Sequence, residues 1–132
     1  MPSNPVSKAR FWTGWVLTAL SGLLLLSTGA MSAIKPEAVA AGVVHLGYPA
    51  SLVSTIGIIE LCCAVLYLIP QTSFLGASLV TVYLGGATAS HVRIGEPFFM
   101  VALVGVVVWV GLFLRDDRLR EFLPFFSWRE NA

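Results

Sequence analysis

The chain has 132 residues, of which 57% are hydrophobic and 11% are charged, and its formal net charge is +1. Soluble domains carry about a quarter of their residues as charged side chains, so this chain lacks the polar surface of a soluble protein. The small net charge, without any basic cluster interleaved with aromatic residues, argues against nucleic acid as a partner. We therefore expect a lipid bilayer to surround much of the chain.

Four apolar segments predict four transmembrane helices, at about residues 11–31, 51–69, 74–90 and 98–114. At about 1.5 Å per residue, each can cross a hydrocarbon core of about 30 Å, the shorter two with little tilt. The first segment is longer than the apolar region of a secretory signal, so we expect a membrane anchor rather than a cleaved leader. The sequence thus predicts an all-α fold: a single domain over residues 1–132 that forms a four-helix transmembrane bundle.

The loop between the first two segments, residues 32–50, predicts a short additional helix on the outer face. Pro36 and Glu37 suit a helix start, and Gly47 suits a stop. Between them, Val39 and Val43 contribute to one apolar stripe. We expect this helix to lie on the outer membrane surface or to cap the bundle.

Lysine and arginine are distributed unequally between the two predicted sides of the membrane. If both termini face the cytoplasm, the outer side carries only Lys35 and Arg93. The inner side then carries six cations, namely Lys8, Arg10, Arg115, Arg118, Arg120 and Arg129. Positive residues favour the cytoplasmic side, so both termini are predicted to be cytoplasmic. The aromatic residues 122–128 are expected to rest on the inner membrane interface or to dock on a partner.

Glu60 is the most unusual residue, because it lies at the middle of the second segment. A charged carboxylate at that depth costs at least about 2.5 kcal/mol, so Glu60 must be neutral, paired or turned to a polar cavity. One interpretation is structural, with Glu60 bonded to a hydroxyl such as that of Thr18, Ser21 or Thr81. The other is functional, with Glu60 acting as a proton donor, proton acceptor or ligand anchor inside the bundle.

A second polar group stands at the outer end of the third segment, where His91 and Arg93 follow Tyr83 and Thr88. In a structural interpretation, His91 caps the last carbonyls, while Arg93 reaches the headgroups and pairs with Glu96. In a functional one, His91 and Arg93 line the mouth of a pocket with Glu60 at its floor. There an imidazole could donate a proton or a hydrogen bond to a polar headgroup.

The predicted site therefore has catalytic and ligand-binding members. His91 and Glu60 are the candidate catalytic residues. Glu60, His91 and either Tyr83 or Thr88 are expected to face the bundle interior. The ligand-binding set is Arg93, Tyr83, Thr88, His45 and Tyr48. His45 and Tyr48 belong to the outer loop and would cover the pocket.

The cysteines and histidines indicate neither thiol chemistry nor a metal site. Cys62 and Cys63 are adjacent in an apolar helix, where a disulfide between them would require a distorted backbone. No Cys-x-x-Cys pair occurs, so both cysteines are interpreted as packing residues. Two histidines and one buried acid match no metal-ligand spacing, and we predict no metal.

Small residues recur at four-residue spacing in two of the predicted helices. The face on the first helix contains Gly14, Thr18 and Gly22. The longer face on the third helix contains Ala77, Thr81, Gly85 and Ala89. Such faces let helix backbones approach closely in lipid. They predict close packing inside the bundle or contact between copies in a homo-oligomer.

Residues 11–97 resemble the DoxX-like family of small bacterial membrane proteins. The more specific parts are the turn His45-Leu-Gly-Tyr-Pro49 and the run Tyr83-Leu-Gly-Gly-Ala-Thr-Ala-Ser-His91. Further matching stretches are Lys35–Gly42, Leu52–Leu61, Leu68–Pro70 and Gly95–Pro97. The resemblance implies a four-helix bundle in a bacterial inner membrane. It also implies His91 as the leading functional residue, because the position of Glu60 is often lysine in this family.

Wider relatives of that family include a subunit of an archaeal quinone-linked thiosulfate oxidoreductase and membrane partners of redox enzymes. The resemblance therefore implies, as the first hypothesis, a redox-associated subunit or small enzyme that acts on a lipid-soluble molecule such as a quinone, with a membrane or redox protein as partner. A second hypothesis is a lipid- or sterol-like binder or isomerase. A third is a non-catalytic membrane assembly or scaffold protein. The first two require a cavity between the helices, and the third requires a filled bundle.

Overall fold

The computed structural model describes residues 5–34 and 36–122, and it consists of helices and short connections. Expectations for Lys35 and for residues 123–132 lie outside these described residues. Four long helices are α1 (Pro5–Ile34), α3 (Val53–Leu68), α4 (Ser73–Arg93) and α5 (Phe99–Arg115). Two shorter ones are α2 (Pro36–His45) and α6 (Asp117–Phe122), and single 3-10 turns span Ala50–Leu52 and Pro70–Thr72. The all-α fold is confirmed, and α2 lies in the loop where a short helix was predicted.

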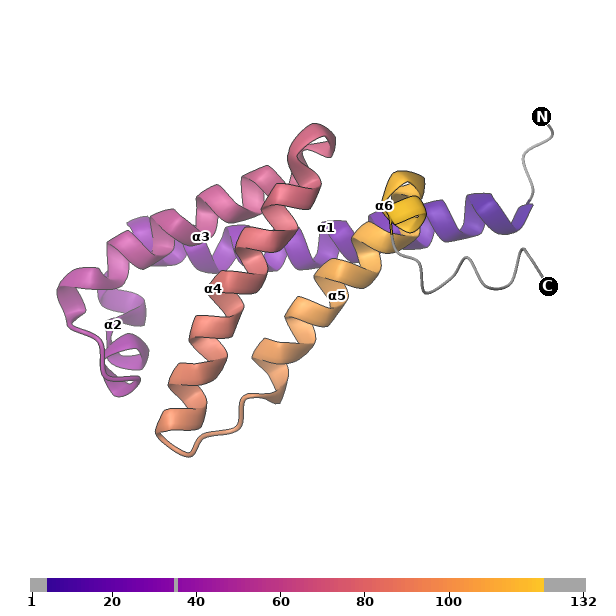
Figure 1. Cartoon of the computed structure of the whole chain (residues 1–132). Coiled ribbons are helices and arrows are strands. Elements are labelled where there is room, and N and C mark those ends of the chain that lie inside the picture. The colour runs from indigo at the N-terminus through magenta and orange to yellow at the C-terminus, as the bar shows by residue number, and fades with distance from the viewer. Residues whose placement is uncertain (1–4, 35, 123–132) are drawn as a thin grey trace.

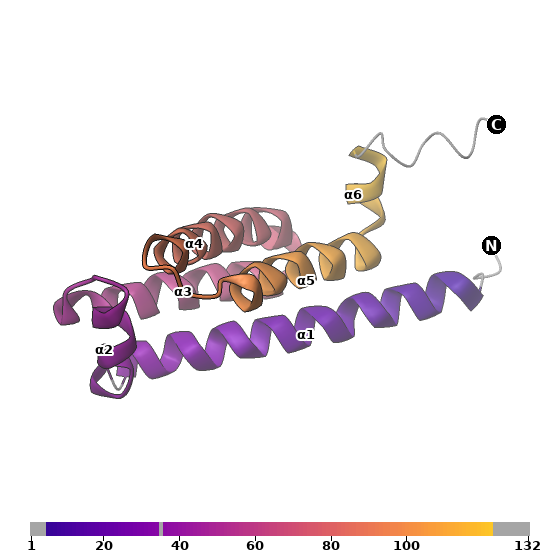
Figure 2. The same cartoon turned by 90° about the horizontal axis from the view of Figure 1, so that it is seen from below.

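The four long helices close into a ring of contacts. Helix α1 packs against α3 and α5, and α4 packs against the same two helices from the opposite side. Among the described residues, the backbones of α1 and α4 do not approach each other, and α3 meets α5 only through side chains such as Tyr67 and Arg115. Helix α2 lies at one end of the bundle and α6 at the other (Figures 1 and 2). The hydrophobic core lies inside this ring and includes Leu25, Tyr67, Val80 and Leu112.

Three helical stretches are long and apolar enough to cross a membrane: Lys8–Ile34, Ala50–Leu68 and Pro70–Arg93, with 27, 19 and 24 residues. Helix α5 is apolar but has 17 residues. At about 1.5 Å per residue it is about 26 Å long, slightly less than the hydrocarbon thickness. The fourth crossing therefore stays a prediction, although α5 lies alongside two of the spanning helices.

Close backbone approach sets how the helices pack. A β-carbon on Gly76 would lie 2.1 Å from the backbone nitrogen of Tyr67, where α4 meets α3. A β-carbon on Gly14 would lie 2.9 Å from the Gly111 carbonyl oxygen, where α1 meets α5. The predicted small-residue face of α1 therefore packs inside the bundle. On α4 the same expectation holds at Ala77, which is fully buried, but not at Gly85, whose added β-carbon would meet no atom within 4 Å.

Arg115 ties the helices together at the end of the bundle where α6 lies. Its guanidinium donates to the Tyr67 carbonyl oxygen at 3.1 Å and to Ser73 Oγ at 2.9 Å, and it lies 4.4 Å from the centre of the Trp15 ring. A cation is favourable here because the Tyr67 carbonyl belongs to the last turn of α3. The sequence had indicated Arg115 only as a charge that orients the chain. Nearby, the Tyr67 hydroxyl donates to the carbonyl of Val108 at 2.9 Å.

Candidate functional site

Glu60 of α3 is 6% exposed and is held between two neighbouring helices. Thr28 Oγ1 of α1 donates to Glu60 Oε1 at 2.5 Å, and the Tyr83 hydroxyl of α4 donates to Oε2 at 3.0 Å. Glu60 is therefore bonded to hydroxyl groups, as the structural interpretation expected. Its predicted partners were wrong, because the Ser21 and Thr81 hydroxyls bond to carbonyls of their own helices.

The relative positions of α1 and α3 explain why the partner is Thr28. Gly29 lies against Gly57 and Leu61, and Gly22 lies against Leu68, so the two helices run antiparallel. Glu60 is therefore level with Thr28. Thr18 lies more than two turns away along α1, where its Oγ1 is 3.3 Å from the Tyr67 hydroxyl.

The Thr28 hydroxyl has more acceptors than hydrogens. Its oxygen is 2.9 Å from the Leu24 carbonyl oxygen, 3.3 Å from that of Leu25 and 2.5 Å from Glu60. A hydroxyl carries one hydrogen. If Thr28 donates to Leu24, a protonated Glu60 can supply the hydrogen in the contact with Thr28; if Glu60 is ionised, Thr28 donates to it. This arrangement can hold or release a proton with no movement of a heavy atom.

Tyr83 connects the buried acid to a pocket of about 320 Å³ between α2, α3 and α4. Val43 of α2 and Leu46, which follows α2, contribute one wall, and Ile56 and Ile59 of α3 contribute another. We call this cavity the tyrosine pocket because Tyr48 and Tyr83 both line it. Glu60 is not among its lining residues, so it lies behind Tyr83 and acts on the pocket only through the phenol.

The polar groups of the tyrosine pocket come from two levels. The Tyr83 hydroxyl bonds inward to Glu60. Nearer the end of α4, Tyr48 and Ser90 share a hydrogen bond of 2.7 Å between their hydroxyl oxygens. The remaining wall is apolar, formed by aliphatic side chains and by Gly86 and Ala87. The pocket can therefore accommodate an apolar ring and form hydrogen bonds at its edge.

None of the pockets found among the described residues is lined by both His91 and Glu60. His91 lines a separate pocket of about 400 Å³ together with His45, Glu96 and residues of α2, and Glu60 does not line that pocket. His91 Nδ1 is 2.8 Å from the Ala87 carbonyl oxygen. The two expected catalytic residues are thus placed apart, because His91 lies at the end of α4 and Glu60 at the middle of α3.

The outer polar residues mainly fasten α2 to the end of α4. His45 Nε2 pairs with Glu96 Oε1, and Arg93 donates to the Leu46 carbonyl oxygen. The expected pair between Arg93 and Glu96 is therefore wrong, because Arg93 turns to the end of α2 and Glu96 turns to His45. Both side chains of the His45–Glu96 pair remain exposed.

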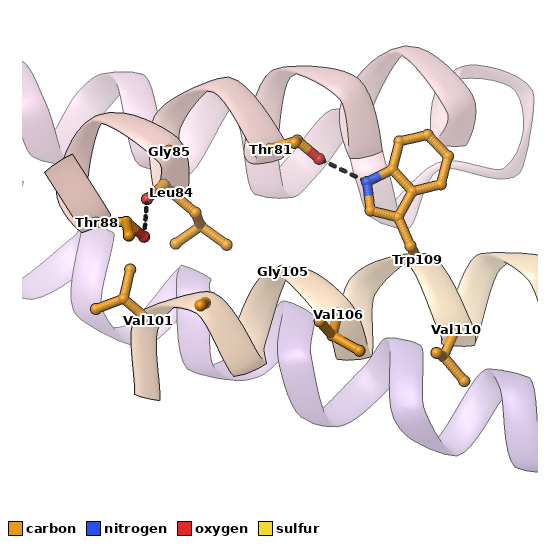
Figure 3. A pocket seen from close by; sticks show the side chains of 10 residues that line it. Thr81, Leu84, Gly85, Thr88, Val101, Gly105, Val106, Trp109 and Val110 are labelled. Atoms are coloured by element: carbon orange, nitrogen blue, oxygen red, sulfur yellow. Dashed lines mark hydrogen bonds between the residues drawn. The ribbon is translucent and has the colours of Figure 1, made fainter. Parts of the chain in front are cut away.

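Thr88 belongs to a different surface feature, a groove of about 420 Å³ between α4 and α5 (Figure 3). We call it the α4–α5 groove. The Thr88 hydroxyl donates to the Leu84 carbonyl oxygen of the same helix at 2.7 Å. Trp109 Nε1 donates across the groove to Thr81 Oγ1 at 2.6 Å, as Figure 3 shows. Thr88 is therefore on the opposite side of α4 from the tyrosine pocket.

Comparison with protein families gives one match, in which the model of the DoxX-like family aligns with residues 16–113. The chain belongs to the DoxX-like family. The matched stretch contains all of α2, α3 and α4, and it includes every residue that lines the tyrosine pocket. No curated protein and no solved structure gave a significant match.

In this DoxX-like membrane protein, two site residues escaped the sequence reasoning. Thr28 was missed because the residue that faces Glu60 depends on how α1 and α3 are aligned. Ser90 lies in the Ala-Ser-His run that carries the family resemblance, but only the structure brings Tyr48 to it. Of the predicted ligand-binding set, Tyr83 and Tyr48 come together in one pocket. His45 and His91 share another, Arg93 contacts α2, and Thr88 lines the groove.

Proposed function

We propose that this DoxX-like protein binds a lipid-soluble molecule with a hydrogen-bond-accepting headgroup, such as a quinone, in the tyrosine pocket. The observation that carries this proposal is Tyr83, a lining residue of the pocket whose hydroxyl bonds to the buried Glu60 at 3.0 Å. A volume of about 320 Å³ lies at the lower end of the range of ligand pockets, about 300–1,000 Å³, and suits one ring system.

The polar groups match the chemistry of a quinone headgroup. A quinone carbonyl accepts hydrogen bonds. The single hydrogen of the Tyr83 hydroxyl bonds to Glu60, so Tyr83 would donate to a quinone when Glu60 is protonated and donates to the phenol oxygen. Tyr48 would donate by turning its hydroxyl from Ser90 to the ligand. Reduction of a quinone to a quinol takes up two electrons and two protons. Tyr83 would contact the ligand, and Glu60 would act through it as a store for one of the two protons. The second proton would come from water, and a membrane or redox protein partner would exchange the electrons.

The proposed setting is the bacterial inner membrane, with both termini in the cytoplasm. Arg10 pairs with Asp117 at 3.5 Å, so the start of α1 and the start of α6 lie at one end of the bundle. Arg115 lies at that end too, whereas Arg93 lies at the other, beside α2. This distribution supports the positive-inside orientation. The tyrosine pocket would then open in the outer half of the membrane.

Two variants separate binding from proton exchange. Tyr83→Phe keeps the ring but removes the hydroxyl that faces both Glu60 and the pocket. A hydrogen bond of this kind is worth about 0.5–1.5 kcal/mol, so we expect quinone affinity to fall up to about tenfold. Glu60→Gln fills the same space and can still accept from Tyr83, so we expect binding and folding to persist while proton-coupled turnover is lost.

The measurement is a titration of the purified protein in lipid nanodiscs with a soluble short-chain benzoquinone. Ser78→Ala is the matched control, because Ser78 lies on α4, bonds to the Phe74 carbonyl oxygen of the same helix, and lines neither the tyrosine pocket nor the α4–α5 groove. Unchanged affinity in Tyr83→Phe would contradict a site at the tyrosine pocket. If Glu60→Gln kept full turnover with a partner, the proton store would be refuted. Release of a sterol-like lipid and no quinone from the pocket would favour the lipid-binder or isomerase hypothesis.

A further inference from the structure

Gly85 and Gly86 are adjacent in the interior of α4, and nothing in the described structure packs against them. An added β-carbon on either residue would meet no atom within 4 Å. Other glycines of the bundle are needed for close approach, as Gly76 is against α3. Glycine also lowers helix stability relative to alanine. Helix packing within this chain therefore gives no reason for two glycines at this place.

The glycine pair lies between the two cavities that flank α4. Gly86 lines the tyrosine pocket, and Gly85 lines the α4–α5 groove. One turn away on the same exposed face lie Val82 and Ala89. Because neither glycine has a side chain, the ridge that separates pocket from groove is lowest at this pair. A flexible chain could pass across α4 here without displacing any side chain.

The chemistry of the α4–α5 groove requires an apolar occupant. Its two threonines already use their hydroxyls: Thr81 donates to Ala77 and accepts from Trp109, and Thr88 donates to Leu84. The rest of the wall is aliphatic or glycine, including Gly105 (Figure 3). The groove therefore offers no unused hydrogen-bond donor to a polar headgroup. The Trp109–Thr81 bond joins α4 to α5 across the groove. Along α4, this bond and Thr88 lie on opposite sides of Gly85.

We propose that the ligand of the tyrosine pocket carries a long apolar chain that crosses α4 over Gly85 and Gly86 and lies in the α4–α5 groove. This inference rests on the proposed function, and it adds to it the class of ligand, a ring headgroup with an isoprenoid or alkyl tail. The bare glycine pair between the pocket and the groove favours the ligand's own chain over an unconnected lipid chain or a helix of a second copy. Either of those would fill the groove without requiring that Gly86 lack a side chain.

The test compares two benzoquinones with the same ring, one with no side chain and one with a ten-carbon chain. Both are titrated into the wild-type protein, Gly85→Leu and Ala19→Leu in nanodiscs. The Gly85→Leu side chain would block the path of the ligand's chain over α4. It has free space there, so we expect the fold to be retained. Ala19 is an exposed residue of α1, far along the chain from the crossing, and serves as the matched control. The longer compound partitions into lipid equally in all three samples, so a difference in affinity between the variants does not come from partitioning.

Beyond its partitioning into lipid, we expect the chain to raise wild-type affinity about tenfold through van der Waals packing in the groove. Gly85→Leu should abolish that advantage and leave the affinity of the chainless ring unchanged, while Ala19→Leu keeps both. A chain advantage that persists in Gly85→Leu overturns the inference and leaves the proposed function standing. Failure of both compounds to bind the wild type overturns the two together. A fall from dimer to monomer mass in Gly85→Leu, with the chain advantage intact, would assign the groove to a second copy.

Discussion

Gly76→Ala should destabilise the bundle strongly, because this glycine lies where α4 turns back against α3. The new β-carbon would lie 2.1 Å from the Tyr67 nitrogen, 2.4 Å from its α-carbon and 2.5 Å from the Leu66 carbonyl carbon. All three are backbone atoms, so no side chain can rotate away. Reaching an ordinary contact of 3.4 Å requires the helices to separate by about 1.3 Å at this point. Overpacking of this kind costs about 1–3 kcal/mol, and we expect the upper end.

The matched control is Gly85→Ala on the same helix. Its added methyl group meets no atom within 4 Å, so only the helix preference for alanine remains, worth about 0.5–1 kcal/mol in favour of folding. Reversible unfolding in mixed detergent micelles, followed by circular dichroism, should therefore move in opposite directions for the two variants. Equal stability of Gly76→Ala and the wild type would refute the close contact between α3 and α4.

Three further predictions follow from the same structure. Reporter fusions at the C-terminus and in the turn at residues 94–97 should report opposite sides of the membrane, with the C-terminus cytoplasmic; a periplasmic C-terminus would reverse the orientation. The double variant Cys62→Ala/Cys63→Ala should keep the fold and quinone binding. It should lower the free energy of unfolding by about 1 kcal/mol, since Cys62 is exposed and only Cys63 is buried. Lost binding in a folded protein would show that a thiol takes part. Arg115→Met should lower stability by about 1–3 kcal/mol, because it loses the bonds to Tyr67 and Ser73. Arg118 is exposed, so Arg118→Met should stay within about 0.5 kcal/mol of wild type. Equal melting temperatures of the two variants would argue against the Arg115 contacts.

The parts of the fold that depend on local sequence could be predicted. An apolar run and its length are local properties, so the segments at residues 51–69 and 74–90 correspond closely to α3 and α4. Pro36 and Gly47 likewise marked the limits of α2. Helix α1 begins at Pro5 and ends at Ile34, beyond the predicted segment, because hydropathy marks the apolar part of a helix and not where its backbone bonds stop.

The site could be predicted only in part, because it depends on which residues of different helices are level. The cost of an unpaired charge in lipid was enough to predict that Glu60 is buried and bonded. The identity of Thr28 as its partner is fixed by the contacts of Gly29 with Gly57 and Leu61, which no local pattern encodes. For the same reason, the sequence did not reveal that His91 and Glu60 line no common pocket among those described. Either Tyr83 or Thr88 was predicted to face inward, but the role of Tyr83 as the link between pocket and acid required coordinates.

The ring of contacts has a consequence for how the protein is made. Synthesis runs from the N-terminus, so α1 meets α3 long before α5 exists, yet its other face is completed only by α5. Until then Gly14 and the Thr18 hydroxyl, both buried in the finished bundle, stand open to lipid. Closing the seam between the first helix and the last long helix is therefore the final assembly step. A nascent chain that stops before Phe99 leaves that seam vacant, and the α5 of another molecule is the segment best shaped to occupy it.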